Sequence, residues 1–137
     1  MKNLILVLSI VFGSLAANAQ NPSVPARIGN RTACTMYVKL MQVNPGCNLV
    51  LTTTYVVPPF SVVTTAAPPP GEWYDAALVS DDPMFNPICY YQKVSVPWAL
   101  CTPYGVTVTG PSCCGPNLTS SWAAGGSPSS PFLIIYQ

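Results

Sequence analysis

The stretch Cys34-Thr35-Met36-Tyr37-Val38-Lys39-Leu40-Met41 alternates apolar and polar side chains over most of its length. A repeat of two residues is typical of a β-strand that buries one face and leaves the other toward solvent. The stretch therefore predicts a strand over 34–41. Its inward face is expected to hold Cys34, Met36, Val38 and Leu40, and its outward face Thr35, Tyr37 and Lys39.

Further segments rich in Val, Thr and aromatic residues follow, separated by turn residues such as Asn44-Pro45-Gly46 and Gly110-Pro111. These segments predict additional strands over 49–57, 60–65, 73–80, 88–96, 104–109 and 132–136. The stretch 112–131 is dominated by Gly, Ser and Pro and is predicted to be a long surface loop. About seven short strands at this spacing favour an all-β fold, an antiparallel β-sandwich of immunoglobulin-like or similar form. A small β-barrel is the alternative that the same pattern allows.

The amino terminus has the features of a signal peptide. Lys2 precedes an apolar run from 4 to 16, and Ala17-Asn18-Ala19 follows the run with small residues at the two positions that a signal peptidase reads. The run is shorter than the roughly 20 residues that a membrane-spanning helix needs. We therefore expect cleavage near Ala19 and a secreted, periplasmic or cell-surface protein that does not span a membrane. The predicted organisation is a signal peptide over 1–19, an extended segment over 20–33 and one β-sandwich domain over 34–137.

Charge and composition exclude several classes of function. The 137 residues include no His, and only 7% of them are charged. Without His, a site that uses an imidazole base or metal ligand from its own chain is excluded. Removal of Lys2 leaves four basic and four acidic residues, scattered singly, which argues against nucleic acid as a partner. Near-zero net charge favours self-association, or contact with a cell-surface protein or polysaccharide. No cofactor is expected.

Six cysteines follow the predicted cleavage site, and in an exported chain they predict three disulfides. They are Cys34, Cys47, Cys89, Cys101, Cys113 and Cys114. Six cysteines allow 15 pairings, and their spacing does not choose among them. Adjacent cysteines rarely pair with each other, so Cys113 and Cys114 are expected to have different partners. The chain has no Cys-x-x-Cys pair, which makes a metal or redox site the weaker interpretation.

Two acidic clusters are candidates for a catalytic site or a metal site. Glu72 and Asp75 are the pair that a small polysaccharide hydrolase would need. Residues three apart on a strand point to opposite faces, however, so solvated charges at a strand start are the preferred interpretation. Asp81, Asp82 and Asn86 concentrate oxygen ligands in one loop and form a candidate calcium site. The same Asp-Asp-Pro sequence is also an ordinary turn starter.

Aromatic side chains are the remaining candidates for ligand contact, here with a sugar face. Trp122 lies in the predicted surface loop and is expected to be accessible, and Trp98 and Tyr91 are the other two candidates. Trp73 follows a turn and is assigned to the core instead. Two sequons, at Asn30 and Asn117, match the pattern for N-glycosylation.

Three short motifs carry a resemblance to a known group of proteins. They are Asn30-x-Thr32-x-Cys34, Val57-Pro58-Pro59 and Pro70-Gly71-Glu72-Trp73. Together they resemble small exported all-β proteins of Gram-negative bacteria that have no assigned activity. The resemblance implies a secreted or surface location and a binding or structural role. With no catalytic constellation in the sequence, we expect a protein that is not an enzyme and that binds or assembles.

Overall fold

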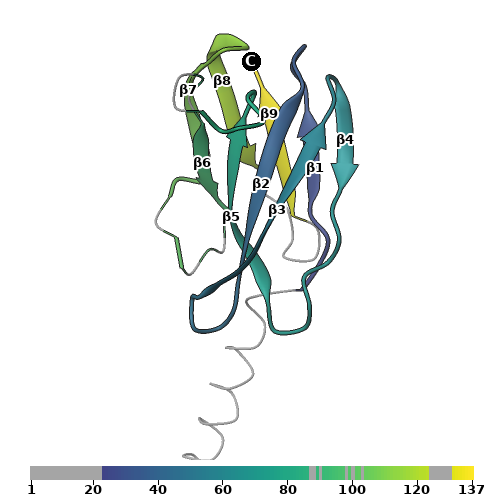
Figure 1. Cartoon of the computed structure of the whole chain (residues 1–137), viewed down its shortest axis with the longest axis vertical. Coiled ribbons are helices and arrows are strands. Elements are labelled where there is room, and N and C mark those ends of the chain that lie inside the picture. Colours follow the sequence, from purple (N-terminus) through teal and green to yellow (C-terminus); the bar gives the residue numbers. More distant parts are fainter. Residues whose placement is uncertain are drawn as a thin grey trace, which may run out of the picture.

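The computed structural model describes residues 23–86, 89, 91–97, 99, 101, 102, 104–123 and 131–137. The predicted signal peptide and Trp98 lie outside these residues. The described part is built from nine strands (Figure 1): β1 Arg27–Asn30, β2 Met36–Val43, β3 Leu49–Val57, β4 Ser61–Thr64, β5 Trp73–Ser80, β6 Gln92–Ser95, β7 Thr107–Ser112, β8 Gly115–Trp122 and β9 Phe132–Tyr136. No helix long and apolar enough to span a membrane occurs among the described residues.

The strands form two hydrogen-bonded sheets, and in the described residues neither closes into a barrel. One sheet has five strands in the order β4-β1-β9-β8-β7, and the other has four in the order β3-β2-β5-β6. The edge strands β3 and β4 belong to different sheets and approach each other where β3 ends and the short turn 58–60 leads into β4, at one margin of the molecule (Figure 1). Strands β6 and β7 lie next to each other at the opposite margin.

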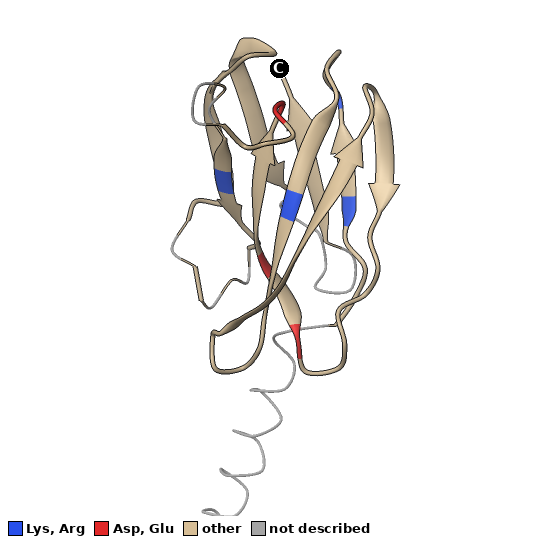
Figure 2. Cartoon of the chain, in the orientation of Figure 1, with Lys and Arg blue, Asp and Glu red and all other residues tan. Residues whose placement is uncertain are grey.

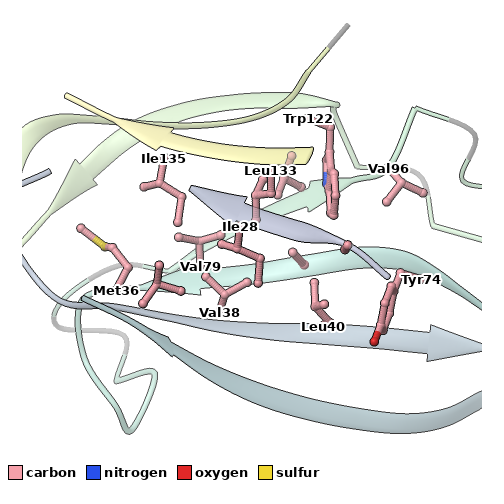
Figure 3. Close-up of a cluster of buried hydrophobic side chains, with 14 of the residues drawn as sticks. Ile28, Met36, Val38, Leu40, Tyr74, Val79, Val96, Trp122, Leu133 and Ile135 are labelled. Carbon is pink, nitrogen blue, oxygen red and sulfur yellow. The ribbon is translucent and has the colours of Figure 1, made fainter. Parts of the chain in front are cut away.

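A single apolar core fills the space between the two sheets (Figure 3). Ile28, Leu133 and Ile135 extend from the five-stranded sheet, and Val38, Leu40 and Val79 face them from the four-stranded sheet. Met36, Val38 and Leu40 are all fully buried, whereas Tyr37 and Lys39 on the other face are partly exposed. The inward-facing positions predicted for Met36, Val38 and Leu40 are thus confirmed. The all-β fold class is confirmed as well.

The segment 112–131 differs from its prediction as a surface loop. Residues Gly115–Trp122 form strand β8, which pairs with β7 and β9. Leu118 and Ser120 are fully buried, and Trp122 is only 2% exposed. The prediction that the Trp122 ring is accessible is therefore wrong, because alternate residues of β8 point into the core.

Strand β1 is the second difference, because it lies within the segment 20–33 that the sequence suggests is only extended. It pairs antiparallel with β4 and parallel with β9, the last strand of the chain. The five-stranded sheet is therefore mixed and not purely antiparallel. Ala26 and Ile28 contribute to the core, so this segment is part of the folded unit.

Three disulfides join the loops, as predicted, and the described residues contain no free cysteine. The bridges are Cys34–Cys114, Cys47–Cys101 and Cys89–Cys113. The adjacent Cys113 and Cys114 have different partners, which confirms that prediction. Two of the three bridges therefore meet at the turn between β7 and β8.

Candidate functional site

The two carboxylates of the hydrolase alternative have separate hydrogen-bond partners. Glu72 precedes β5 and accepts a hydrogen bond from the side-chain amide of Gln42. Asp75 lies within β5 and is fully buried. Its Oδ1 atom accepts a hydrogen bond from the backbone N–H of Cys101 at 3.3 Å.

Asp75 owes its position to a β-bulge. On β2, Met41 pairs with Ala76 and Gln42 pairs with Tyr74, so Asp75 is the extra residue of β5. A bulge breaks the alternation of faces, and here it allows Tyr74 to join the core cluster. The backbone carbonyl of Asp75 accepts the N–H of Val96 at 3.0 Å. Asp75 therefore anchors the loop that follows β6 through both its main chain and its side chain.

The loop of the calcium candidate is closed by its own hydrogen bonds. Asp82 Oδ1 accepts the N–H of Met84 at 2.9 Å, and Oδ2 accepts the N–H of Asn86 at 3.1 Å. The Asp81 carboxylate accepts instead from the N–H of Cys114, in the turn between β7 and β8. The structure thus directs the two neighbouring carboxylates to different donors, an arrangement that fits the turn interpretation.

One group of metal-ligating atoms does come together near this loop. A carboxylate oxygen of Asp81 and the sulfur atoms of Cys89 and Cys113 all lie within 4.8 Å of one another. The two sulfurs are bonded to each other, however, and metals bind the thiolate form of cysteine. In its disulfide-bonded form the group therefore offers a metal ion only one ligand, the carboxylate of Asp81. An open cavity of about 290 Å³ adjoins it, lined by Cys34, Thr35, Tyr37, Asp81, Cys113 and Cys114.

Aromatic rings near the surface contact cations. The Nζ atom of Lys93 lies 5.6 Å from the ring centre of Tyr91, one of the predicted ligand contacts, and 5.5 Å from that of Tyr104. Lys39 lies 4.4 Å from the ring centre of Phe85. Such cation–π contacts occupy one face of each ring. The partly buried Tyr91 is therefore placed beside Lys93.

The most distinctive surface of the described part is apolar and lies along β3 and β4. Nine large hydrophobic side chains are exposed in the described residues, and six of them lie here, at exposed fractions from 46% to 74%. These six are Leu49, Val50, Leu51, Val56, Phe60 and Val62. We call this surface the β3–β4 margin. Figure 2 shows β3 and β4 without a charged residue.

Sequence reasoning did not single out this margin, although a signal for it is present. Between Lys39 and Glu72 the chain has no charged residue. Natural edge strands usually carry charges that discourage pairing with other chains. A long uncharged segment that contains two strands is thus the signal for an open edge.

Comparison of the chain with protein-family models, with curated proteins and with solved structures found no match.

Proposed function

We propose that this chain is an exported, non-catalytic module with an immunoglobulin-like β-sandwich fold, which binds or assembles through the β3–β4 margin. In this proposal residues 1–19 are removed as a signal peptide. Disulfides are typical of proteins in oxidising compartments, and the three bridges support export to such a compartment.

The observation that carries the non-catalytic role is the use of the carboxylates. The chain has four acidic residues, and each accepts a hydrogen bond from another group of the same chain. Three of the donors are backbone N–H groups of loops, so Asp75, Asp81 and Asp82 hold loops in place. A glycosidase requires two carboxyl groups that face one substrate. Four carboxylates with structural partners favour a binding role over hydrolysis.

The margin supports the binding role. Exposed apolar side chains that gather on one surface mark an interaction site more often than scattered ones do. Here they come from β3, from the turn that follows it and from β4, and the long edge of β3 offers additional backbone hydrogen bonds. Apolar side chains and free strand edges together suit a partner that is itself a β-strand.

Hydrolysis assays test this proposal. Purified oxidised protein is incubated with soluble xylan, starch and carboxymethylcellulose, and the release of reducing ends is measured. Wild type is expected to release none above the buffer control. Glu72→Gln and Asp75→Asn are the variants, and Asp82→Asn is the matched control that removes a carboxylate outside the pair. Hydrolysis by wild type that is lost in Glu72→Gln and Asp75→Asn but kept in Asp82→Asn would overturn the non-catalytic role.

A further inference from the structure

We propose that the partner of the β3–β4 margin is a second copy of this chain, bound by antiparallel pairing of β3 with β3 around Thr53. This inference rests on the proposed function, because it names the partner of the same surface. The product is a symmetric dimer in which the two four-stranded sheets join into one.

The first argument is that β3 is an unprotected edge. It is the terminal strand of its sheet and pairs on one side only, with β2. Native edge strands are commonly protected by charges, by Pro or by very short length. Strand β3 has nine residues and contains neither a charged residue nor Pro. Its one irregularity is a bulge at Val50, because Gln42 pairs with Leu51 and Val43 pairs with Leu49. From Leu51 to Val57 the edge is regular. Its outer row of N–H and C=O groups is thus suited to a further strand.

The second argument is that the sequence of β3 is self-complementary. Three apolar residues, Leu49–Leu51, precede three threonines, and three apolar or aromatic residues, Tyr55–Val57, follow them. Antiparallel pairing centred on Thr53 therefore places Thr52 opposite Thr54 and Leu51 opposite Tyr55 within the regular part of β3, with the two apolar ends near each other. Cross-strand pairs of threonines and of apolar side chains are the favourable pairs in antiparallel sheets.

The third argument is that this register keeps the two faces of the sheet matched. Tyr55 and Thr53 pair with the core-facing Val38 and Leu40 of β2, so they lie on the core side of β3. Leu51 follows on the same side by alternation, yet it is 51% exposed. Pairing around Thr53 places Leu51 opposite Tyr55 of the second copy, also on the core side. Each copy then covers apolar surface that the other leaves open.

The fourth argument concerns charge and the neighbouring strand. A two-fold axis brings identical surfaces together, so a β3 with charges of one sign at its centre would repel itself. The margin has no charge, and the basic and acidic residues of the described part are equal in number. Phe60 and Val62 follow the end of β3 in the chain and extend the apolar surface to the five-stranded sheet.

A charge-swap pair of variants tests the register. Thr52 and Thr54 are both exposed, and Thr54 pairs with Lys39 within the chain. In Thr52→Glu/Thr54→Glu, the proposed dimer places two Glu–Glu pairs across its axis. In Thr52→Lys/Thr54→Glu, it places two Lys–Glu pairs there. Because both variants keep Glu opposite Lys39, they differ at position 52 only.

The readout is sedimentation velocity over a concentration series, with circular dichroism to verify that both variants fold. Wild type and the Lys/Glu variant are expected to dimerise, and the Glu/Glu variant to bind at least about tenfold more weakly than the Lys/Glu variant. Wild type that stays monomeric up to about 100 µM would overturn the proposal, since a dimer with a micromolar Kd would predominate at that concentration. Equal dimerisation, or equal loss of it, in the two variants would overturn it as well.

A cysteine at the axis is the second test and does not depend on added charge. In Thr53→Cys the two new thiols face each other at the Cα separation of an antiparallel pair, which suits a disulfide. Non-reducing electrophoresis should show a covalent dimer, whereas Thr107→Cys, at an exposed position on β7, should give little. Equal cross-linking of the two variants would contradict a two-fold axis at Thr53. A monomer that hydrolyses nothing would refute this inference and leave the non-catalytic role intact.

Discussion

Replacing Asn30 by Ala removes a side chain that joins the ends of three strands. Asn30 ends β1 and is only 1% exposed. Its Nδ2 group donates to the carbonyls of Cys34 at 2.7 Å, Val57 at 3.0 Å and Pro58 at 3.0 Å. Its Oδ1 atom accepts from the backbone N–H of Thr32 at 2.9 Å and from its hydroxyl at 2.8 Å. One buried amide thus connects the two sheets.

The expected cost follows from the groups that lose a partner. The carbonyl of Cys34 keeps a contact with the Thr32 hydroxyl at 3.2 Å, but the carbonyl of Val57 and the N–H of Thr32 lose their side-chain partner. A buried polar group left unsatisfied costs about 1–3 kcal/mol. With two such groups, and partial relief by water, we expect Asn30→Ala to lower the free energy of unfolding by about 3–4 kcal/mol.

Urea unfolding of the oxidised protein measures this loss. Asn117→Ala is the matched control, because Asn117 is exposed on β8, and its effect should stay within about 0.5 kcal/mol. The dependence on urea should be the same for both variants, so the shift in midpoint reports stability. A loss below about 1 kcal/mol for Asn30→Ala, or one no larger than that of the control, would refute the assignment of Asn30 as the connecting group.

Two further predictions concern the core and the outer face of the five-stranded sheet. Burial raises the pKa of Tyr74 to about 12, while its hydroxyl donates to the carbonyl of Ala66 at 2.7 Å. Between about pH 10 and 12 the unfolded chain loses this proton while the native state keeps it. The free energy of unfolding should therefore fall by about 2–3 kcal/mol as the pH rises through this range. Urea titrations of Tyr74→Phe should show no such fall. Gly29→Ala would place a Cβ 2.9 Å from the ring of Phe132 and should cost about 1–3 kcal/mol in thermal or urea unfolding. Gly110→Ala, whose Cβ would meet its nearest atom at 3.8 Å, should cost much less, and an equal cost would contradict the steric reason.

Local pattern was sufficient for the strands that are rich in β-branched, aromatic and other apolar residues. Strands β3, β5 and β9 have the predicted bounds, and β2 is displaced by only two residues at each end. In each case Val, Leu, Ile or aromatic residues occupy the strand and Gly, Pro or Asn residues bound it. Such signals act within a few residues, so they can be recognised without the rest of the fold.

Strand β8 was missed because a polar residue occupies an inward position. Ser120 is fully buried, and its hydroxyl donates to Oε1 of Gln92 on β6 at 2.5 Å. The amide of Gln92 in turn donates to the carbonyl of Leu118 at 2.6 Å. The partner that makes Ser120 compatible with the core lies 28 residues away in the sequence. The segment is rich in Gly, Ser and Pro, and with a serine between Leu118 and Trp122 its sequence therefore predicts a loop.

Long-range pairing accounts for the other differences. Strand β1 has four residues, Arg27–Asn30, and its composition predicts no strand. It becomes one because β4 and β9 hydrogen-bond to it on both sides. The disulfide pairing likewise depends on which loops meet in space, as Cys34 and Cys114 do over a separation of 80 residues.

The same topology argues for a closed dimer and not for a filament. A filament needs a second open edge, and the opposite margin is formed by β6 and β7. Strand β6 has four residues and carries the exposed Lys93, while β7 contains Pro111, and these are features that protect edges. On the open margin, β2 is flanked by Cys34 and Cys47, both in disulfides, which opposes any slip in its register with β3. Since a two-fold pairing uses the β3 edge of both copies, association should stop at two, and sedimentation at high concentration should show dimers without larger species.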